Sequence, residues 1–321
     1  MCFSRGGSKV SPMARRVLLL YNSAKPEVHA ALPRVRQAIA SGGGVIVAEL
    51  SAENESVPLG LAEAVTASKG ASVMVTLGGD GTLLSQTRRW IHLDLPMLGV
   101  NFGKLGFLAE FDMASLIEQS TQLFDGRELE VMRRPLMEVR VLRSNADPHR
   151  ELDAPFHLAL NDAAIIAGPP HRMIRCALGI DGHRGPSILG DGLIICTPAG
   201  STAYNVSAGG PILAVGMRCL CITAIAAHTL AFRPVVLPGN ARVDVTLERA
   251  NDPAPIDASG AAGAAGTVLL LDGRAVAKLH TGDRVLACLH EREAAFVTNP
   301  RIGYWETLSK KMHWATSPGA R

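Results

Sequence analysis

An apolar, β-branched stretch at residues 72–77 ends abruptly in the loop Gly78-Gly79-Asp80-Gly81-Thr82, and residues 83–90 then look helical. A strand that turns through glycines into a helix is the outline of a phosphate site, because glycines permit close approach and the first helical amides have no intrahelical partner. Asp80 is unusual there, since a carboxylate beside phosphate costs Coulomb energy unless it holds a metal or acts on the reacting group. The Walker loop Gly-x-x-x-x-Gly-Lys-Ser/Thr does not occur in the sequence. The alternative is an ordinary glycine-rich turn.

Composition is typical of a soluble globular protein. The 321 residues are 47% hydrophobic and 19% charged, which indicates two domains, or one large domain, with well-filled cores. The net charge of +3 is too weak to indicate nucleic acid or a membrane surface as a partner. No apolar run reaches about 18 residues, so we expect no transmembrane helix. Residues 1–16 precede only a short apolar run, which favours a first strand over a signal peptide, and Met13 is an alternative start.

Cysteine and histidine spacing does not predict a metal site. No Cys-x-x-Cys pair occurs among the six cysteines, which are Cys2, Cys176, Cys196, Cys219, Cys221 and Cys288. Most lie in apolar runs, so we expect buried thiols in a reducing compartment, a cytoplasmic location and no metal ligated by the protein alone.

The first part of the chain alternates strands with helices. Strands are expected at residues 16–21, 45–50, 72–77 and 96–100, and helices at 26–40, 59–68 and 83–90. This alternation predicts a parallel sheet with right-handed crossovers, in which ligands bind beyond the carboxyl ends of the strands. The glycine loop falls at such an end. The glycines at residues 42–44 join a helix to a strand and are interpreted as a helix stop.

After about Gly126 the pattern becomes all-β. Short apolar or alternating runs, separated by Gly, Pro, Asn or Asp, are expected strands at residues 136–142, 156–160, 163–167, 174–180, 193–197, 220–226, 241–247, 267–271 and 283–288. Helices are expected only at residues 202–207 and 209–215, and residues 251–266 are interpreted as a flexible hairpin loop. The predicted division is an α/β domain at 13–125, a β-sandwich-like domain at 126–297 and a helical tail at 298–321.

The Gly-Gly-Asp-Gly-Thr loop resembles a signature of NAD kinases, of diacylglycerol and sphingosine kinases and, more distantly, of 6-phosphofructokinases. Other segments resemble NAD kinases specifically, and they occur in that family's order: Leu98-Gly99-Val100-Asn101, Leu105-Gly106-Phe107-Leu108, Leu160-Asn161-Asp162, Asp191-Gly192-Leu193, residues 197–204 with 207–211, His228-Thr229-Leu230 with Arg233-Pro234, and the tail at 304–314. The resemblance covers roughly residues 16–315.

For the loop, the resemblance implies that Asp80 is the catalytic base. A carboxylate at hydrogen-bond distance from a hydroxyl orients it and accepts its proton late in phosphoryl transfer. The implied hydroxyl is the 2′-OH of the adenosine ribose of NAD. Gly78, Gly79 and Gly81 would give the phosphates of ATP room, with Thr82 at the helix start. Magnesium, or another divalent cation, is expected to arrive with ATP.

The resemblance also implies a set of NAD contacts in the β-rich part. Asn161 offers a paired donor and acceptor to the adenine, and Asp162 suits ribose hydroxyls. The Asp191 position reaches NAD from the neighbouring subunit in the family, which implies a homodimer or homotetramer. The expected NAD-binding positions are Asp80, Gly81, Asn161, Asp162, Arg172, Asp191, Thr202, Ala203, Tyr204, Asn205, Val206, Ser207 and Ala226. A strand-end turn at Asn161 and a solvated charge at Arg172 are the structural alternatives.

Several positions depart from the family pattern. Ala199 replaces a common hydroxyl residue, Phe102 stands where bacterial members often carry Arg, and Leu189 and Arg274 replace residues that are often polar or Gln. These departures leave open whether ATP or polyphosphate is the donor and whether NAD or NADH is the acceptor. Two other functions are alternatives: a lipid kinase, which leaves Asn161-Asp162 and residues 197–204 unexplained, and a non-catalytic NAD(P)-sensing module, which is disfavoured because Asp80 is present.

Overall fold

The structure is a computed structural model of the chain, and it describes residues 14–52, 60–103, 106–145, 151, 153–252 and 266–312. The chain divides into two compact units. The α/β unit comprises Met1–Met132 and Ala294–Arg321, and the β unit comprises Arg133–Glu293. The β unit is therefore one continuous stretch of sequence, whereas the α/β unit is assembled from two stretches.

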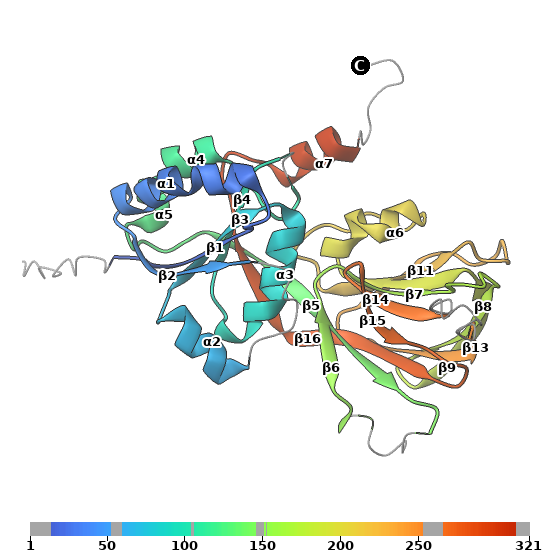
Figure 1. Cartoon of the computed structure of the whole chain (residues 1–321). Coiled ribbons are helices and arrows are strands. Elements are labelled where there is room, and N and C mark those ends of the chain that lie inside the picture. The colour runs from blue at the N-terminus through green and yellow to red at the C-terminus, as the bar shows by residue number, and fades with distance from the viewer. Residues whose placement is uncertain are drawn as a thin grey trace, which may run out of the picture. The chain divides into compact units, whose positions relative to one another are not determined.

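A parallel sheet forms the centre of the α/β unit (Figure 1). Its strand order is β2 (Val45–Ser51), β1 (Arg16–Tyr21), β3 (Val73–Gly78) and β4 (Met97–Asn101). The last residues of β16 (Arg284–Val297) continue the sheet beside β4, with Phe296 opposite Met97. All residues of β3 and β4 are buried, as expected for parallel strands that are covered on both faces.

Helices cover both faces of this sheet (Figure 1). One face is covered by α1 (Pro26–Ser41), which contacts α4 (Met113–Glu118) and α5 (Ser120–Phe124). The other face is covered by α2 (Leu61–Ser68), α3 (Asp80–Trp90) and the 3-10 turn η1 (Ile91–Leu93). Helix α1 begins with Pro26 at its first position and ends at Ser41 with Gly42 as its C-cap, which confirms the predicted helix stop. It buries Val28, Leu32, Val35 and Ile39, whose spacing places them on one face.

The tail helix α7 (Tyr304–Met312) belongs to the α/β unit. The Tyr304 ring lies 6.4 Å, centroid to centroid, from the Phe107 ring, and Lys311 Nζ lies 4.6 Å from the centroid of the same ring. Aromatic and cation–π contacts of this kind attach the end of the chain to the loop that follows β4.

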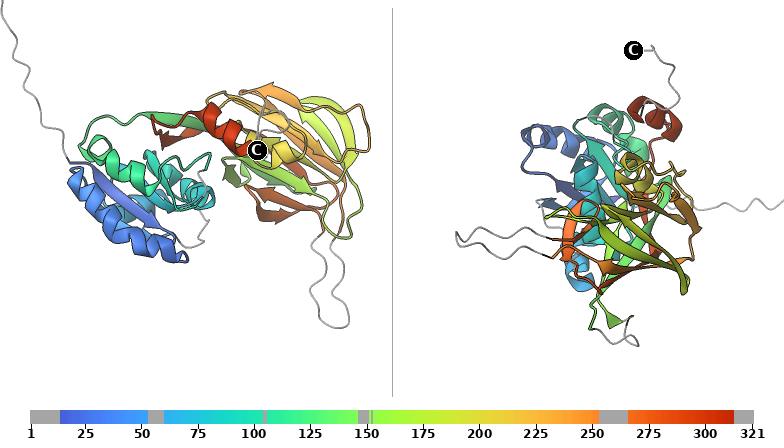
Figure 2. Two further views of the ribbon diagram at one scale, coloured as in Figure 1. Left: turned by 90° about the horizontal axis from the view of Figure 1, so that it is seen from above. Right: turned by 90° about the vertical axis from the view of Figure 1, so that its right-hand side faces the viewer.

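Two antiparallel sheets form the β unit (Figures 1 and 2). One contains β16, β13 (Arg242–Arg249), β8 (Ile174–Ile180) and β9 (His183–Gly190), with β5 (Val131–Leu142) paired to β16 and to β6 (Phe156–Ala159). The other has the order β12 (Val235–Pro238), β11 (Cys219–Ile225), β10 (Gly192–Cys196), β7 (Asp162–Ile166), β14 (Val268–Leu271) and β15 (Arg274–Lys278).

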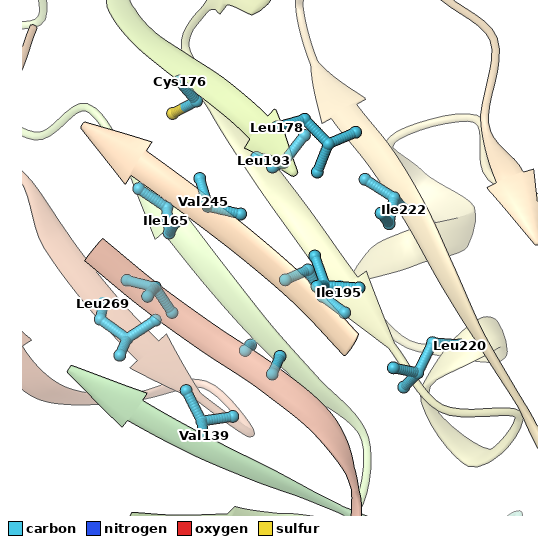
Figure 3. Packing of buried hydrophobic residues seen from close by; sticks show 14 of the residues in the cluster. Val139, Ile165, Cys176, Leu178, Leu193, Ile195, Leu220, Ile222, Val245 and Leu269 are labelled. Atoms are coloured by element: carbon cyan, nitrogen blue, oxygen red, sulfur yellow. The ribbon is translucent and has the colours of Figure 1, made fainter. Parts of the chain in front are cut away.

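The inward faces of the two sheets make one apolar core, part of which Figure 3 shows. Val139, Cys176 and Val245 come from the first sheet. Ile165 and Ile195 come from the second, and all five side chains are at most 2% exposed. Interdigitation of alternate residues from two facing sheets is the packing of a β-sandwich. The predicted fold class, an α/β part, a sandwich-like β part and a C-terminal helix, is confirmed.

Some predicted elements are wrong. Residues 209–215 form no helix: Gly209 has φ 82°, and the Ser201 hydroxyl accepts the Leu213 N–H at 3.1 Å, so the segment folds back in an irregular conformation. The helix expected at 202–207 is two short pieces, η3 (Ala199–Thr202) and α6 (Tyr204–Ser207), broken at Ala203. Strands β6 and β7 are separate, as predicted, but the break between them lies at Leu160-Asn161, one residue before the expected break at residues 161–162. Strands β9, β12 and β15 and helices α4 and α5 were not expected.

Most of the loop expected at residues 251–266 lies outside the described residues. The described helices include none that combines the length and apolarity needed to cross a bilayer. The cysteines in the described ranges are free thiols: Cys176, Cys196, Cys219 and Cys221 are buried, and Cys288 is half-buried.

Candidate active site

The glycine loop lies at the carboxyl ends of the central parallel strands. Gly78 is the last residue of β3 and pairs with Asn101, the last residue of β4. Asn22 follows β1, donates its backbone N–H to the Leu77 carbonyl at 3.1 Å, and its side-chain amide lies 3.4 Å from Thr82 Oγ1. The predicted position of the loop at a strand end is confirmed, whereas the sequence analysis did not predict that Asn22 lies beside it. A polar residue directly after a buried strand is the signal that would have found it.

Three backbone amides hold the Asp80 carboxylate. Phe107 N–H donates to Oδ2 at 2.7 Å, and the N–H groups of Leu108 and Ala109 donate to Oδ1 at 3.3 and 3.0 Å. Asp80 is not the N-cap of α3, because Gly79 occupies that position and Asp80 is the first helical residue. The carboxylate is half-buried and is therefore fixed in direction by the loop that follows β4 rather than by its own helix. A carboxylate has about four lone-pair sites, so it can still accept a further hydrogen bond.

The glycines of the loop differ in what the fold demands of them. A β-carbon on Gly78 would lie 2.4 Å from Thr82 Oγ1, so the chain itself requires glycine there. A β-carbon on Gly81 would have nothing within 4 Å, and one on Gly79 would meet only Asn101 Oδ1 at 3.8 Å. Neither Gly79 nor Gly81 has a positive φ. Glycine inside a helix costs roughly 0.5–1 kcal/mol relative to alanine, and within the described residues no contact explains why Gly81 in α3 accepts that cost.

In the β unit, the Asn161-Asp162 motif lies at the start of β7. Asp272, in the turn between β14 and β15, accepts the backbone N–H groups of Leu160, Asn161 and Asp162 at 3.1, 2.7 and 3.2 Å. The Asn161 carbonyl accepts the Thr197 N–H at 2.9 Å. Gly200 passes so close that a β-carbon there would lie 2.0 Å from that same carbonyl oxygen. The segment carrying the motif is thus held from two sides, and sequence reasoning did not single out Asp272.

Burial and a second carboxylate act on Asp162, which is 4% exposed. Desolvation and then the charge of Asp272 raise the pKa of Asp162 to about 7, while a backbone hydrogen bond from Tyr204 opposes the shift. Perturbed carboxyl groups of this kind occur preferentially at functional sites. Asn161, next to it, is half-buried, so its amide remains partly accessible.

The predicted contacts at residues 202–207 separate into accessible and inaccessible groups. Tyr204 is 40% exposed, and Ser207 is also exposed. Thr202, Ala203 and Val206 are half-buried. Asn205 is fully buried: its amide nitrogen donates to the Ser201 and Pro211 carbonyls at 3.3 and 3.0 Å, and its Oδ1 accepts the Thr223 hydroxyl at 2.7 Å. The polar atoms of the Asn205 side chain are therefore bonded to other residues of the β unit.

The other predicted positions lie at loop surfaces of the β unit. Arg172 is exposed, and its carbonyl accepts the side-chain amide of Asn251 at 2.8 Å. Asp191 has an exposed side chain, and its backbone N–H donates to the Ile225 carbonyl at 3.0 Å. Ala226 is exposed at φ 45°. The predicted site residues accordingly form two groups, the glycine loop with Asp80 in the α/β unit and the remaining positions in the β unit.

A cavity of about 730 Å³ in the β unit contains none of the predicted residues. It lies over strands β5, β8, β13 and β16, on the face that points away from the sandwich core. Its acids are paired with its arginines: Glu138 binds Arg140 at 2.7 Å, and Arg284 bridges Asp244 and Glu151. Since these charges neutralise one another, the cavity does not favour a charged nucleotide.

No group of three or more His, Cys, Asp or Glu side chains that could hold a metal is found where the structure describes the chain.

The sequence matches known protein families and relatives over most of its length. A family model described as the ATP-NAD kinase N-terminal domain matches residues 50–128, and one described as the ATP-NAD kinase C-terminal domain matches residues 160–298. The chain is 30% identical over 302 residues to an NAD kinase of Rhodopirellula baltica, covering 94% of this chain and 87% of the relative. It is 35% identical to an NAD kinase of Trichlorobacter lovleyi, covering 76% of this chain and 79% of the relative.

Two solved structures share the fold. The yeast NADH kinase complexed with NADH superposes with a TM-score of 0.78 at 19% identity, covering 97% of this chain and 91% of that chain. An NAD kinase from Archaeoglobus fulgidus in complex with ATP superposes with a TM-score of 0.64 at 22% identity, covering 93% of this chain and 98% of that chain.

Proposed function

The chain belongs to the ATP-NAD kinase family, and from that membership we infer that it is an NAD kinase, which transfers the γ-phosphate of ATP to the 2′-hydroxyl of the adenosine ribose of NAD. The observation that supports this chemistry best is the Asp80 carboxylate, which three backbone amides hold at the start of α3. Gly79 and Gly81 lie beside it, although no contact in the described structure requires glycine at either position.

Asp80 acts as the general base of this reaction. Its remaining lone pair binds the 2′-hydroxyl, orients the oxygen toward the γ-phosphorus and accepts the proton as the new O–P bond forms and the bond to the ADP oxygen breaks. Phosphoryl transfer has a loose transition state, so most of the catalytic effect comes from positioning and charge neutralisation. The backbone N–H groups of residues 107–109 keep the Asp80 carboxylate in one position. Because the donors are backbone groups, rotation of a partner side chain cannot break these hydrogen bonds.

The start of α3 binds the phosphates of ATP. Helix α3 has eleven residues, and its first amides, from Asp80 onward, have no intrahelical acceptor. Gly79 and Gly81 leave open space where β-carbons would stand, which allows phosphate oxygens to approach the backbone. The negative charge of Asp80 in this place is compatible with phosphate only if a cation accompanies the nucleotide.

A divalent cation, Mg²⁺ in the first instance, arrives with ATP rather than in a cage of protein ligands. The donor chemistry fits this arrangement, since three of the Asp80 lone pairs are already taken by amides and Mg²⁺ keeps several waters when bound through phosphates. When bound, the ion neutralises charge on the phosphate oxygens.

Asn161 and Asp162 bind the adenosine part of NAD. The Asn161 amide offers a donor and an acceptor to the adenine edge, and the ionised Asp162 carboxylate accepts hydrogen bonds from ribose hydroxyls. Tyr204, exposed and next to this motif through its backbone bond to Asp162, provides an aromatic face for stacking. Arg172 and Asp191, both exposed, complete the proposed set, with Asp191 acting in the pocket of a second subunit of a homodimer or homotetramer in the cytoplasm.

The lipid-kinase and sensing-module alternatives explain less. The C-terminal family match begins at residue 160 and so includes the Asn161-Asp162 motif and the segment 197–204, which a lipid kinase leaves without a role. A sensing module leaves the fixed carboxylate of Asp80 without a role.

One assay tests the function and the open choices of substrate together. Purified protein with Mg²⁺ is incubated with ATP or polyphosphate and with NAD or NADH, and the 2′-phosphorylated product is detected with a dehydrogenase specific for NADP. We expect product from ATP with NAD. Failure of all four combinations to exceed the level seen with Asp80→Asn would reject the assignment.

A further inference from the structure

Asp272 connects a hairpin turn to the proposed NAD-binding motif. Asp272 and Gly273 are the two central residues of the β14–β15 turn, with φ 48° and 78°, the conformation of a two-residue hairpin that favours Asp-Gly. We propose that Asp272 is a positioning residue for NAD recognition, which holds the backbone of residues 160–162 so that the Asn161 and Asp162 side chains keep their binding directions. The inference rests on the NAD kinase function proposed above.

The contact between the turn and the motif runs in both directions. The Asp272 carboxylate accepts three consecutive backbone N–H groups of the motif, and the Asp272 N–H donates back to the Asp162 carbonyl at 2.9 Å. Bonds between a charged acceptor and backbone N–H groups are about twice as strong as neutral ones. Residues 160–162 lie between β6 and the start of β7, so without this acceptor three consecutive amides of a largely buried segment would lose their partner.

A second Asp-Gly turn in the same unit shows what hairpin geometry alone requires. Asp181 and Gly182 join β8 to β9 with φ 52° and 77°, nearly the same backbone conformation. The Asp181 carboxylate accepts the N–H of Arg242, the first residue of the neighbouring strand β13, at 2.8 Å. Asp181 therefore attaches a hairpin turn to the start of a strand, as Asp272 does. The N–H group that Asp181 accepts, however, belongs to a segment for which no ligand contact is proposed.

The charge of Asp272 gives the contact a second effect. Among the described residues, three groups face the Asp162 carboxyl: Asp272 from the β14–β15 turn, the Cys196 thiol from the directly opposite position in β10, and the Tyr204 amide from α6. Burial and the Asp272 charge raise the pKa of Asp162 to about 7, and only the Tyr204 amide opposes them. Asp162 therefore changes from a neutral acid to an acceptor-only carboxylate near neutral pH.

This change in the charge of Asp162 should alter the affinity for NAD, because ribose hydroxyls form stronger hydrogen bonds to a carboxylate than to a neutral acid. NAD affinity is expected to increase as the pH rises through about 7, the value to which the pKa of Asp162 is raised. Removing the Asp272 charge should move this increase to lower pH. Asp272 thus holds the backbone that carries Asp162 and adds to the effect of burial in raising the pKa of the Asp162 carboxyl.

The test compares the full-length protein with Asp272→Asn, which keeps the shape of the side chain and tolerates a positive φ. We expect the KM for NAD to rise roughly 5- to 100-fold, the range for unsatisfied buried amides, with kcat and the KM for ATP within about 3-fold of the parent. In calorimetric titrations with NAD, the pH midpoint of affinity should move down, and Asp162→Asn should abolish the pH step. The matched control Asp181→Asn should change neither the KM for NAD nor the midpoint.

Two readouts need no activity. Hydrogen exchange at the amides of residues 160–162 should be faster in Asp272→Asn than in the parent, and carboxyl ¹³C NMR of the unmodified protein without nucleotide should show Asp162 titrating near pH 7. Slow exchange in the variant, or an Asp162 carboxyl that titrates near its ordinary 3.8, would overturn the inference. Absence of NADP formation by a parent that passes both readouts would reject the kinase function and leave the positioning role standing.

Discussion

The backbone at Gly106 fills the space against the Asp80 carboxylate, so that a β-carbon on residue 106 would lie 1.7 Å from Asp80 Oδ1. Glycine at 106 is therefore a condition for the carboxylate to reach the amides of Phe107, Leu108 and Ala109. The glycine loop and the segment around Gly106, two of the segments that resemble the family, are therefore in direct contact inside the α/β unit.

Replacement of Asp80 by Asn should reduce kcat by about 100-fold or more, because an amide does not accept the hydroxyl proton. The variant also places a donor opposite one of the three amides, which should lower the free energy of unfolding by about 1–3 kcal/mol. Steady-state kinetics and urea unfolding separate the two effects. Asp112→Ala is the control: it removes the N-cap bond to Ser115 N–H in the same unit, costs about 1 kcal/mol, and should leave kcat unchanged.

Alanine at Gly106 and alanine at Gly81 should act in opposite ways on stability. Gly106→Ala displaces the Asp80 carboxylate and should lower both kcat and the melting temperature. Gly81→Ala meets no atom within 4 Å and should raise the free energy of unfolding by roughly 0.5–1 kcal/mol, yet increase the KM for ATP, because its methyl group occupies the proposed phosphate position. A Gly81→Ala enzyme with parental ATP kinetics would remove the helix start from the proposed site. Gly60→Ala, also without a neighbour within 4 Å, is the control.

Asp162 should make the protein less stable as the pH rises from 4 to 7. Its pKa is raised from the ordinary 3.8 to about 7, so the native state binds more protons than the unfolded state in this window, and the free energy of unfolding falls with increasing pH. The upper limit of the effect is about 4 kcal/mol. Urea unfolding of the parent and of Asp162→Asn at pH 5 and pH 8 measures it. The variant should lose less stability between the two pH values, and equal losses would show that Asp162 does not titrate there.

Loss of the Thr223 hydroxyl should destabilise the fold without weakening NAD binding directly. In Thr223→Val, Asn205 Oδ1 loses its donor while the volume of the side chain is nearly unchanged, so we expect a loss of about 1–3 kcal/mol. If the Asn205 side chain serves the fold, Thr223→Val and Asn205→Ala should both reduce stability and leave the KM for NAD within a few-fold. A large increase in that KM for Asn205→Ala alone would restore Asn205 to the binding site.

Asp191 should act in a neighbouring subunit's pocket. Mixing inactive Asp80→Asn chains with inactive Asp191→Ala chains should restore part of the activity, because one of the two sites in a mixed dimer would then carry both carboxylates. Specific activity should also fall on dilution below the dimer dissociation constant. Mixed dimers that are detected by mass but remain inactive would return Asp191 to its own chain.

The sequence predicts the buried elements better than the exposed ones. Strands β1, β3 and β4 are nearly continuous apolar runs that end at, or directly before, Gly or Asn, which makes their positions clear. Strand β9 was missed because its first five residues, 183–187, are exposed and carry no apolar alternation. The helix expected at 209–215 does not form, because buried polar groups of Ser201 and Asn205 bond that segment in an irregular conformation.

For the candidate site, the sequence predicts what depends on neighbouring residues but not what depends on long-range contacts. Asp80 was identified because its chemistry conflicts with its surroundings in sequence, and the conflict is visible locally. The roles of Gly106 and Asp272 depend on contacts between segments that are distant in sequence, and Asp272 lies 110 positions from Asp162. A single sequence contains no local pattern that reports such a contact.

The β unit is an uninterrupted stretch placed within the sequence of the α/β unit, and this has a consequence for biosynthesis. On the ribosome, all residues of the β unit emerge before Ala294, the first residue of the stretch that supplies the edge of the parallel sheet and α7. The β unit is thus the first to have its full complement of residues, although its sequence starts second. The α/β unit, which carries the proposed catalytic carboxylate, has its full set of residues only after residues 294 onward have emerged, so the fold that holds Asp80 can be completed only after synthesis of the β unit has finished.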